Sequence, residues 1–414
     1  MITYAILLVF VLPLFAQEGR TGTKATPLSS RLWEIREKYE IIGMSVVAVK
    51  DDQIIYSEAF GHMDPNRRKP ATPATIYRIA SISKTVAAAV LLQLHEQGKF
   101  DLDDDISDVL GYAVRNPKHP DVPITYKQLL THTSSLTDGG RYGTYLMAAY
   151  REKEPPSIRE ILLPGGRFFS DSTFADYAPG SGQFTYCNLG FGLVGTLVEI
   201  LSGERFDIYC REHIFKPMGL KASFNVADID VNALTPLYRK VEGEWRAQAD
   251  SFGGVQPIQR DLSSYVIGSN GSLYGPQGGL RISVEELGQF MLMILQGGAY
   301  RNVQILRAET VEKMLDLHWE GTGYEGFYRR KGLAVQRTID LYPGIELFGH
   351  GGDAYGLLSA MYFSPEHRLG IAFAMNGGRQ EKGKGVFSAF EEDVARILFE
   401  ELFNPLSEIP ALPR

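Results

Sequence analysis

The sequence predicts an α+β protein: an antiparallel β-sheet flanked by N- and C-terminal helices, with a mostly helical subdomain inserted. Three observations lead to this prediction. Helix and strand patterns alternate in residues 28–80, the middle of the chain is mostly helical, and the last third returns to strands and closes with a long amphipathic helix. Joining both ends of the chain into one sheet is the simplest way to bury these apolar faces. A site between the two parts is then expected.

Composition is that of a sizeable globular protein. The chain has 414 residues, of which 44% are hydrophobic, enough for a large core or two closely packed subdomains. Its formal net charge is −7 and it has no basic stripe, which argues against a nucleic-acid partner. No His, Cys or carboxylate cluster has metal-ligand spacing, so we expect neither a metal nor another cofactor.

The first residues predict export. Residues 2–16 form an almost continuous apolar run that is short for a membrane span, and a polar stretch follows Ala16. We therefore expect a signal peptide at 1–16, a periplasmic or extracellular protein and no stable membrane insertion. Because the run contains no Lys or Arg, an uncleaved anchor stays open as the alternative. A linker at 17–27, one folded domain at 28–403 and a tail at 404–414 complete the chain.

The elements are predicted in order along the domain. Strands at 44–49 and 53–60 flank a tight turn and predict a hairpin. A buried helix is predicted at 78–99, where Ala, Val and Leu fill the centre and Gly98 is typical of a helix C-terminus. The remaining helices are expected at 28–39, 125–131, 157–163, 189–201, 282–295, 308–317 and 386–403, with possible short strands at 235–250. The closing strands are expected at 332–335, 346–350, 356–363 and 370–375. The sheet part thus comprises about 28–80 and 330–403, and the helical part about 81–329.

Ser81 and Lys84 are the first candidate site residues. On a helix, residues three apart share a face, so this hydroxyl and this amine can meet. The positive end of the helix beside Ser81 favours a forming alkoxide, and a nucleophile needs a base within reach. Taken alone, the pair also fits a first-turn serine and a solvated lysine. However, ten uncharged residues follow Lys84, which places its amine at the head of a buried helix.

Two further motifs carry candidate residues. Tyr186-Cys187-Asn188 precedes a helix rich in small residues. Phe348-Gly349-His350-Gly351-Gly352 ends an apolar strand, and its last two glycines leave room for a ligand backbone. The alternative for His350 is a hydrogen-bonded histidine at a sheet edge, and His132 is interpreted as structural.

Some other patterns are interpreted as structural. Gly190 to Gly195 match G-x-G-x-x-G, but no strand precedes them, so the glycines are expected to let this helix pack closely on a neighbour. Cys187 and Cys210 are too few for a disulfide framework and are expected to be buried, although export leaves a bond between them open.

These motifs in this order resemble the serine β-lactamase and penicillin-binding-protein superfamily, above all its class C branch and the related esterases and D-amino-acid peptidases. Further segments look like family segments: I-Y-R-I-A-S-I-S-K-T at 76–85, Q-L-L-T-H-T-S-S-L at 128–136 and Y-F-S-P-E-H-R-L-G-I-A at 362–372. The resemblance covers nearly all of 28–403 and implies a β-lactamase/transpeptidase-like fold and a catalytic domain.

The resemblance also implies roles for the candidate residues. Ser81 would be the nucleophile, Lys84 its proton partner and Tyr186 a second acid or base. Asn188 would orient the substrate or Lys84. The substrate-binding strand would contain His350, Gly351 and Gly352, and the oxyanion hole would consist of the backbone N–H groups of Ser81 and Asp353. A buried amine can reach a pKa near 7, and a cationic amine can instead activate the phenol, so either Lys84 or Tyr186 can be the base.

Two departures from the family pattern bear on the substrate. Gly351 stands where the family's K-T-G motif has a hydroxyl residue, and His350 stands in place of the Lys. Both argue against a strong β-lactamase. We therefore expect an exported serine hydrolase that forms an acyl-enzyme on Ser81, with a small-molecule ester, amide or peptidoglycan-like substrate. The alternatives are a D-alanyl-D-alanine carboxypeptidase or β-lactamase, and, in another class, a penicillin-binding or sensing protein that does not turn over.

Overall fold

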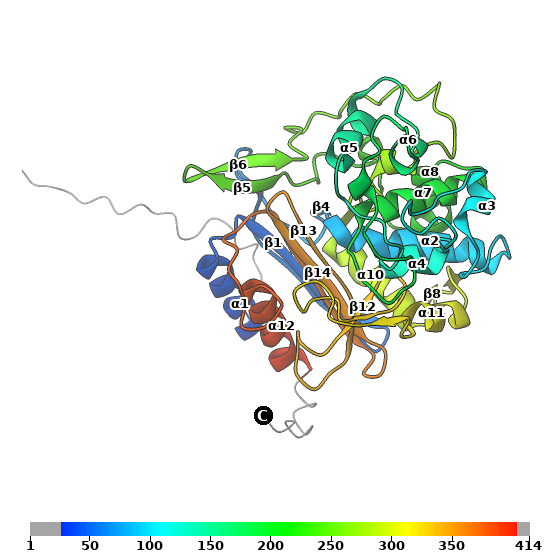
Figure 1. Ribbon diagram of the computed structural model, residues 1–414. Coiled ribbons are helices and arrows are strands. Elements are labelled where there is room, and N and C mark those ends of the chain that lie inside the picture. Colours follow the sequence, from blue (N-terminus) through cyan, green and yellow to red (C-terminus); the bar gives the residue numbers. More distant parts are fainter. Residues whose placement is uncertain (1–25, 404–414) are drawn as a thin grey trace, which may run out of the picture.

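The computed structural model describes residues 26–403 (Figure 1). The predicted signal peptide, the tail at 404–414 and nearly all of the linker lie outside these residues and stay predictions. Within them the protein has the predicted α+β fold. Nine strands form one antiparallel sheet in the order β10-β11-β12-β13-β14-β15-β1-β2-β3. The two ends of the domain are joined in this sheet, because β15 pairs with β1.

The sheet contains the predicted hairpin at its N-terminal side. Asp51 and Asp52 both have positive φ angles, as a tight two-residue hairpin turn requires. The strands at this side are β1 (Gly43–Lys50), β2 (Gln53–Asp64) and β3 (Lys69–Pro70). The central strands are β13 (Leu347–Ala354), β14 (Leu357–Ser364) and β15 (Leu369–Met375). The far edge consists of β10 (Trp319–Glu320), β11 (Arg330–Lys331) and β12 (Gln336–Thr338).

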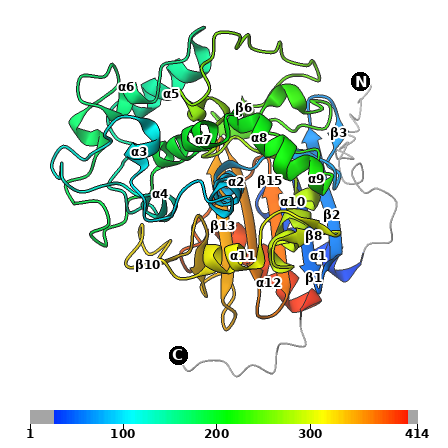
Figure 2. The ribbon, with the colours of Figure 1, turned by 90° about the vertical axis from the view of Figure 1, so that its right-hand side faces the viewer.

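Helices cover both faces of the sheet (Figures 1 and 2). On one face, α1 (Pro27–Lys38) and α12 (Ala389–Leu402) share an apolar cluster with the strands. On the other face, α10 (Val284–Leu295) lies against β1 and β15. A Cβ at Gly288 would lie 2.9 Å from a methyl carbon of Val47, so this glycine allows α10 to approach the sheet closely.

The helical part surrounds α2 (Ser83–Glu96), which is buried on nearly every side. Gly98 follows α2 in the left-handed conformation, and the backbone N–H groups of Gly98 and Lys99 bond to the carbonyls of His95 and Leu94, as predicted for a glycine helix end. The other helices are α3 (Ile106–Leu110), α4 (Tyr126–Thr131), α5 (Tyr142–Arg151), α6 (Arg159–Leu162), α7 (Asn188–Ser202), α8 (Phe206–Cys210), α9 (Lys216–Met218) and α11 (Ala308–Leu315).

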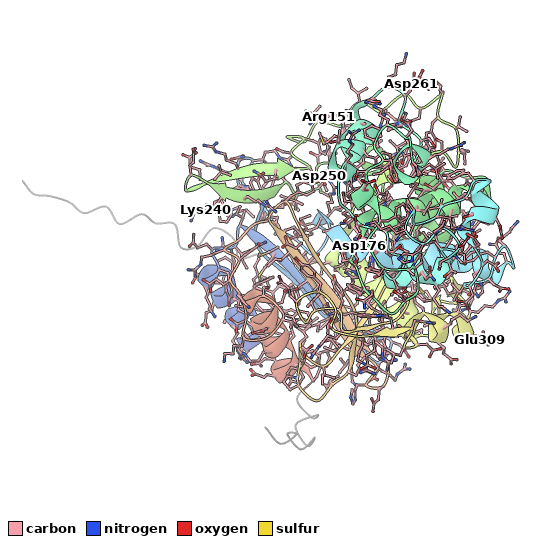
Figure 3. All side chains as sticks on the ribbon, in the orientation of Figure 1. Arg151, Asp176, Lys240, Asp250, Asp261 and Glu309 are labelled. Carbon is pink, nitrogen blue, oxygen red and sulfur yellow. The ribbon has the colours of Figure 1, made fainter. Side chains whose placement is uncertain are left out.

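Short strand pairs complete the chain. They are β4 (Ile76–Arg78) with β7 (Arg281–Ser283), β5 (Leu237–Val241) with β6 (Glu244–Ala249), and β8 (Ala299–Tyr300) with β9 (Val303–Gln304). The β5–β6 hairpin projects from the body of the protein. Its Lys240 points outward, as do Asp261 and Glu309 elsewhere on the surface (Figure 3).

Glycines in α7 permit the close packing that the sequence predicted. A Cβ at Gly192 would lie 2.2 Å from Oγ of Ser272, and one at Gly195 would lie 2.9 Å from the Pro276 ring. The helix therefore packs directly on the 3-10 turn Gly271–Tyr274 and on the residues that follow it. This contact brings Gln277 to the site described below.

Away from the Ser81 turn, which is described with the site below, two sequence predictions about secondary structure were wrong. The stretch 332–335 is a turn and not a strand: it connects β11 to β12, and Ala334 has a φ of +58°. Its residues are apolar because the turn is buried in the core. Residues 137–184 were expected to hold one short helix, yet α5 also forms there. Its buried face, formed by Tyr142, Tyr145, Ala148 and Ala149, has helical spacing despite the neighbouring glycines.

Cys187 and Cys210 are both buried and unpaired, as expected from their number. Among residues 26–403, no helix is long and apolar enough to cross a membrane. The same residues contain no group of three His, Cys, Asp or Glu side chains that could hold a metal ion.

Gly352 sets the distance between β13 and the Ser81 turn, and this distance can be tested. A Cβ at Gly352 would lie 2.4 Å from the backbone oxygen of Ile79. We expect Gly352→Ala to push the strand away from the turn, lowering the free energy of unfolding by about 1–3 kcal/mol in urea titrations.

Gly351→Ala is the matched control. Its added methyl group would meet no atom closer than 3.6 Å, so the free energy of unfolding should stay near that of the wild type. Equal stability of the two variants would contradict the tight contact at Gly352.

Candidate active site

Ser81 lies in a strained turn directly before α2. The turn is a single 3-10 turn, Ala80–Ile82, and not the first turn of the α-helix that the sequence predicted. Ala80 has a φ of +49°, which residues other than glycine rarely adopt and which often marks functional positions. The hydroxyl of Ser83 donates to the carbonyl of Ala80 at 2.6 Å and accepts from the N–H of Leu280 at 3.0 Å, so it braces the turn.

Lys84 is fully buried and its amine reaches three oxygens. Nζ lies 3.0 Å from Oγ of Ser81, 2.8 Å from Oδ1 of Asn188 and 2.6 Å from the carbonyl oxygen of Gln277. An amide and a peptide oxygen can only accept, so each takes one hydrogen of the amine. In a neutral amine, the lone pair is then left for the hydroxyl of Ser81.

Burial lowers the pKa of Lys84 to about 7, because an ammonium loses its hydration there. The negative charge of Asp138 opposes this shift in pKa, and the positive charge of Lys331 adds to it. Near neutral pH a substantial fraction of the amine is therefore unprotonated and able to accept a proton.

Asp138 fixes the orientation of Asn188. Its carboxylate accepts the backbone N–H groups of Asn188 and Leu189 at 2.7 and 2.8 Å, at the start of α7. It also accepts the side-chain amide of Asn188 at 2.7 Å, which turns Oδ1 toward Lys84. Asp138 had no signal in the sequence, because 50 positions separate it from Asn188 and nothing local marks it as a helix cap.

Tyr186 stands in an aromatic stack next to the amine. Nζ of Lys84 lies 4.9 Å from its ring centre, and the rings of His132 and Tyr328 lie at 4.5 and 5.2 Å on either side. Burial raises the pKa of the Tyr186 phenol, while hydrogen bonds with Ser81 and Tyr328 act in the opposite direction. The net rise in pKa keeps the phenol protonated at neutral pH, so it is suited to donate a proton.

His132 has the structural role that its sequence context suggested. It ends α4 with a φ of +62°, and its Nδ1 accepts the N–H of Cys187 at 3.2 Å. This bond ties the end of α4 to the residue between Tyr186 and Asn188.

His350 lies behind the cavity and not at its surface. Its side chain is fully buried and does not line the cavity beside Ser81. Nδ1 lies 2.6 Å from the carbonyl oxygen of Gly351 and therefore carries the proton. Burial, with the charges of Lys331 and Lys84, holds the pKa of His350 well below its usual range, so the imidazole is neutral.

A cavity of about 1090 Å³ opens beside Ser81. Gly351, Gly352 and Asp353 of β13 line it, as do Tyr186 and Tyr328. Ser81 and Asp353, the two residues expected to form an oxyanion hole, therefore face the same space. Four carboxylates but one amine line the walls: Glu325, Asp353, Glu381 and Glu391, against Lys382. Burial raises the pKa of Glu391 to about 6.

Three more residues at the site had no signal in the sequence. Gln277 contributes only a backbone oxygen, which any residue has. Tyr328 and Lys331 come from a stretch of glycines, aromatic residues and charges without a recognisable motif. Tyr328 has a φ of +59°, and Lys331 is fully buried. All three reach the site through folding alone.

Comparisons with known proteins identify the family of the chain. A family model described as Beta-lactamase matches residues 28–387. The chain is 25% identical over 193 residues to protein flp of Staphylococcus aureus strain MW2. That match covers 45% of this chain and 35% of the flp protein, so the chain spans about a third of the length of this relative.

Other relatives match over more of their length. A putative D-alanyl-D-alanine carboxypeptidase of Escherichia coli O157:H7 is 24% identical over 331 residues, which is 75% of this chain and 73% of that protein. The crystal structure of D-amino acid amidase from Ochrobactrum anthropi SV3 has the same fold. Its TM-score is 0.67 at 21% identity, covering 92% of this chain and 100% of the other. On the family match, which spans most of the domain, the chain belongs to the beta-lactamase family, within the serine β-lactamase and penicillin-binding-protein-like superfamily.

Proposed function

We propose that the protein is a serine hydrolase that cleaves an ester or a D-amino-acid amide through an acyl-enzyme on Ser81. One observation carries this proposal: Nζ of Lys84 lies 3.0 Å from Oγ of Ser81, and Oδ1 of Asn188 and the carbonyl oxygen of Gln277 accept two of its hydrogens. Such an amine has a lone pair for the hydroxyl proton, which is what an activated nucleophile requires.

The proposed acylation uses the residues in the following order. Oγ of Ser81 bonds to the substrate carbonyl carbon while its proton passes to Lys84. The backbone N–H groups of Ser81 and Asp353 bind the oxyanion, each contributing about 3–4 kcal/mol of transition-state stabilisation. The bond to the leaving group breaks as the Tyr186 phenol protonates it. Water then attacks the acyl group with the proton transfers reversed, which releases the acid and restores Ser81.

The pKa directions support a division of labour between the two proton carriers. Burial lowers the pKa of Lys84 to about 7 and raises the pKa of Tyr186. The amine is thus favoured as the base for Ser81, and the phenol as the acid for the leaving group. The sequence alone left open whether Lys84 or Tyr186 is the base.

The cavity favours substrates without a carboxylate. Gly351 offers no hydroxyl group, His350 is neutral and does not line the cavity, and four carboxylates surround the space. Penicillins and D-alanyl-D-alanine peptides carry a carboxylate that this surface would repel. The likeness in fold to a D-amino acid amidase supports amides of D-amino acids among the substrates, whereas the likeness to a putative D-alanyl-D-alanine carboxypeptidase supports the alternative. Export rests on the apolar run at 2–16 and stays a prediction.

Replacing Ser81 tests the nucleophile. We expect Ser81→Ala to abolish turnover of p-nitrophenyl butyrate and the covalent adduct with a fluorophosphonate probe, measured by intact mass. The exposed Ser181 provides the control, since Ser181→Ala should leave both signals unchanged.

Wild-type turnover in the Ser81→Ala variant would remove this residue from the mechanism. Hydrolysis of nitrocefin at rates typical of efficient enzymes, with kcat/KM above roughly 10⁶ M⁻¹ s⁻¹, would contradict the proposed substrate class. A penicillin adduct that forms but never turns over would favour the sensing alternative.

The pH dependence tests Lys84 as the base. Because only the neutral amine accepts a proton, kcat/KM should be level above pH 7 and fall about tenfold per unit below it. Ester hydrolysis followed from pH 5 to 10 measures both the plateau and the fall in kcat/KM. A profile that stays flat to pH 5, or one that rises only toward pH 10, would rule out an amine with this pKa.

Tyr186→Phe tests the phenol as the acid. Amide leaving groups need a proton, whereas p-nitrophenolate leaves without one. We expect kcat for a D-amino-acid amide to fall about 10²–10⁴-fold, and kcat for the p-nitrophenyl ester to fall less than about tenfold. Equal losses for both substrates would argue against a role in leaving-group protonation.

A further inference from the structure

Lys331 is a second buried amine, and the proposed acyl transfer does not use it. It is the last residue of β11, its side chain is fully buried, and its Nζ has no hydrogen-bond partner within residues 26–403. Nζ lies 5.0 Å from the centre of the Tyr328 ring. Lysine is almost never fully buried without a partner, so this position needs a physical explanation.

Tyr328 connects Lys331 to the reacting groups. Its ring stacks on Tyr186, with 5.2 Å between the centres and 16° between the planes. The two phenols also share a hydrogen bond, and Tyr328 lines the cavity beside Ser81. Its φ of +59° is unusual for a bulky residue, so tertiary contacts hold it in place. Lys331 on one side and Tyr186 on the other are two of these contacts.

The surroundings of Lys331 are rich in acceptors. Gln336 pairs with Lys331 across β11 and β12, and cross-strand partners present their side chains on the same face. Oε1 of Gln336 is buried without a partner in the described chain, and so is Nε2 of His350. Since Nδ1 of His350 carries the proton, Nε2 presents a lone pair. Neither acceptor forms a hydrogen bond with Nζ in the described chain, so the ring face of Tyr328 is the observed contact that favours a cation at this position.

Two histidines near the amines carry no charge, whereas two carboxylates near them can. Burial holds the pKa values of His132 and His350 well below their usual range, so both imidazoles are neutral. Burial lowers the pKa of Lys331 to about 7, the same range as that of Lys84. The remaining groups that face this cluster are the phenols of Tyr186 and Tyr328, the thiol of Cys187, and the carboxylates of Asp138 and Glu391.

We propose that Lys331 is a positioning residue for acyl transfer, which rests on the proposed function. The positive charge of Lys331, behind Tyr328, keeps the proton off Lys84 near neutral pH. Two like charges in one buried site disfavour each other, and such a pair titrates as a coupled system. A proton on Lys331 therefore leaves Lys84 in the neutral form that accepts the proton of Ser81.

Charge-changing variants of Lys331 test this proposal. Lys331→Met keeps the apolar volume and removes the charge, so the pKa of Lys84 should rise by about one unit. One unit below the wild-type midpoint, kcat/KM for the p-nitrophenyl ester should then be about tenfold below that of the wild type. On the high-pH plateau it should stay within about twofold. Lys331→Arg keeps the charge and should retain the wild-type midpoint.

A titration of the lysine signals gives a second readout that needs no turnover. In protein labelled with ¹³C at lysine Cε, the Lys84 signal, assigned with Lys84→Met, should titrate at a higher pH in Lys331→Met than in the wild type. Lys216→Met removes an exposed lysine and should move neither the signal nor the pH profile.

An unchanged Lys84 midpoint in Lys331→Met, with activity lost equally at every pH, would show a purely structural role and overturn the proposal. A midpoint in Lys331→Arg that matches Lys331→Met would do the same. A wild-type protein that the probe does not label at Ser81 would instead refute the proposed function. The lysine titration would still report whether the two amines interact.

Discussion

The burial of the Lys84 amine is the constraint on which the rest of the site depends. The fully buried lysine at the head of α2 has no access to water, so the protein must supply its hydrogen-bond partners. These come from the turn before α2, from the start of α7 and from the chain beyond the turn Gly271–Tyr274. Each of these segments is held by packing or capping that involves no substrate, so the amine is oriented before any ligand arrives.

The site lies where the sheet meets the helical part, and two close backbone contacts hold its segments near one another. At one contact, glycines of α7 allow the helix to approach the Gly271–Tyr274 turn, which brings the Gln277 carbonyl to the amine. At the other, Gly352 lets β13 lie against the Ser81 turn, and Ser359 donates to the carbonyl of Ile79 at 3.0 Å. Ser81, the Lys84 amine and the strand are thus held by rigid elements, beside a cavity that four carboxylates line.

The parts of the fold that could be predicted from the sequence are those with local causes. The β1–β2 hairpin follows from strand periodicity and a turn that tolerates positive φ, and the end of α2 follows from Gly98. The glycines of α7 were interpreted correctly because no strand precedes them. The two errors have a shared cause, since burial by distant segments overrode local composition at α5 and at the turn 332–335. Ser81 and Lys84 were found because they lie only three positions apart in the chain, whereas Asp138, Tyr328 and Lys331 have no such local signal.

Sequence alone therefore determined the order of the elements, the proximity of the Ser81 and Lys84 side chains, and the candidate residues at 186–188 and 350–353. Tertiary structure decided what these groups can do. It turned Asn188 toward the amine through Asp138, placed His350 behind the cavity wall, and gathered two buried lysines and two cavity-lining tyrosines in one cluster. The physical reason is that protonation depends on desolvation and on the charges within a few ångströms. Both are set by residues far apart in the chain, which become neighbours only on folding: 50 positions separate Asp138 from Asn188, and 193 separate Lys84 from Gln277.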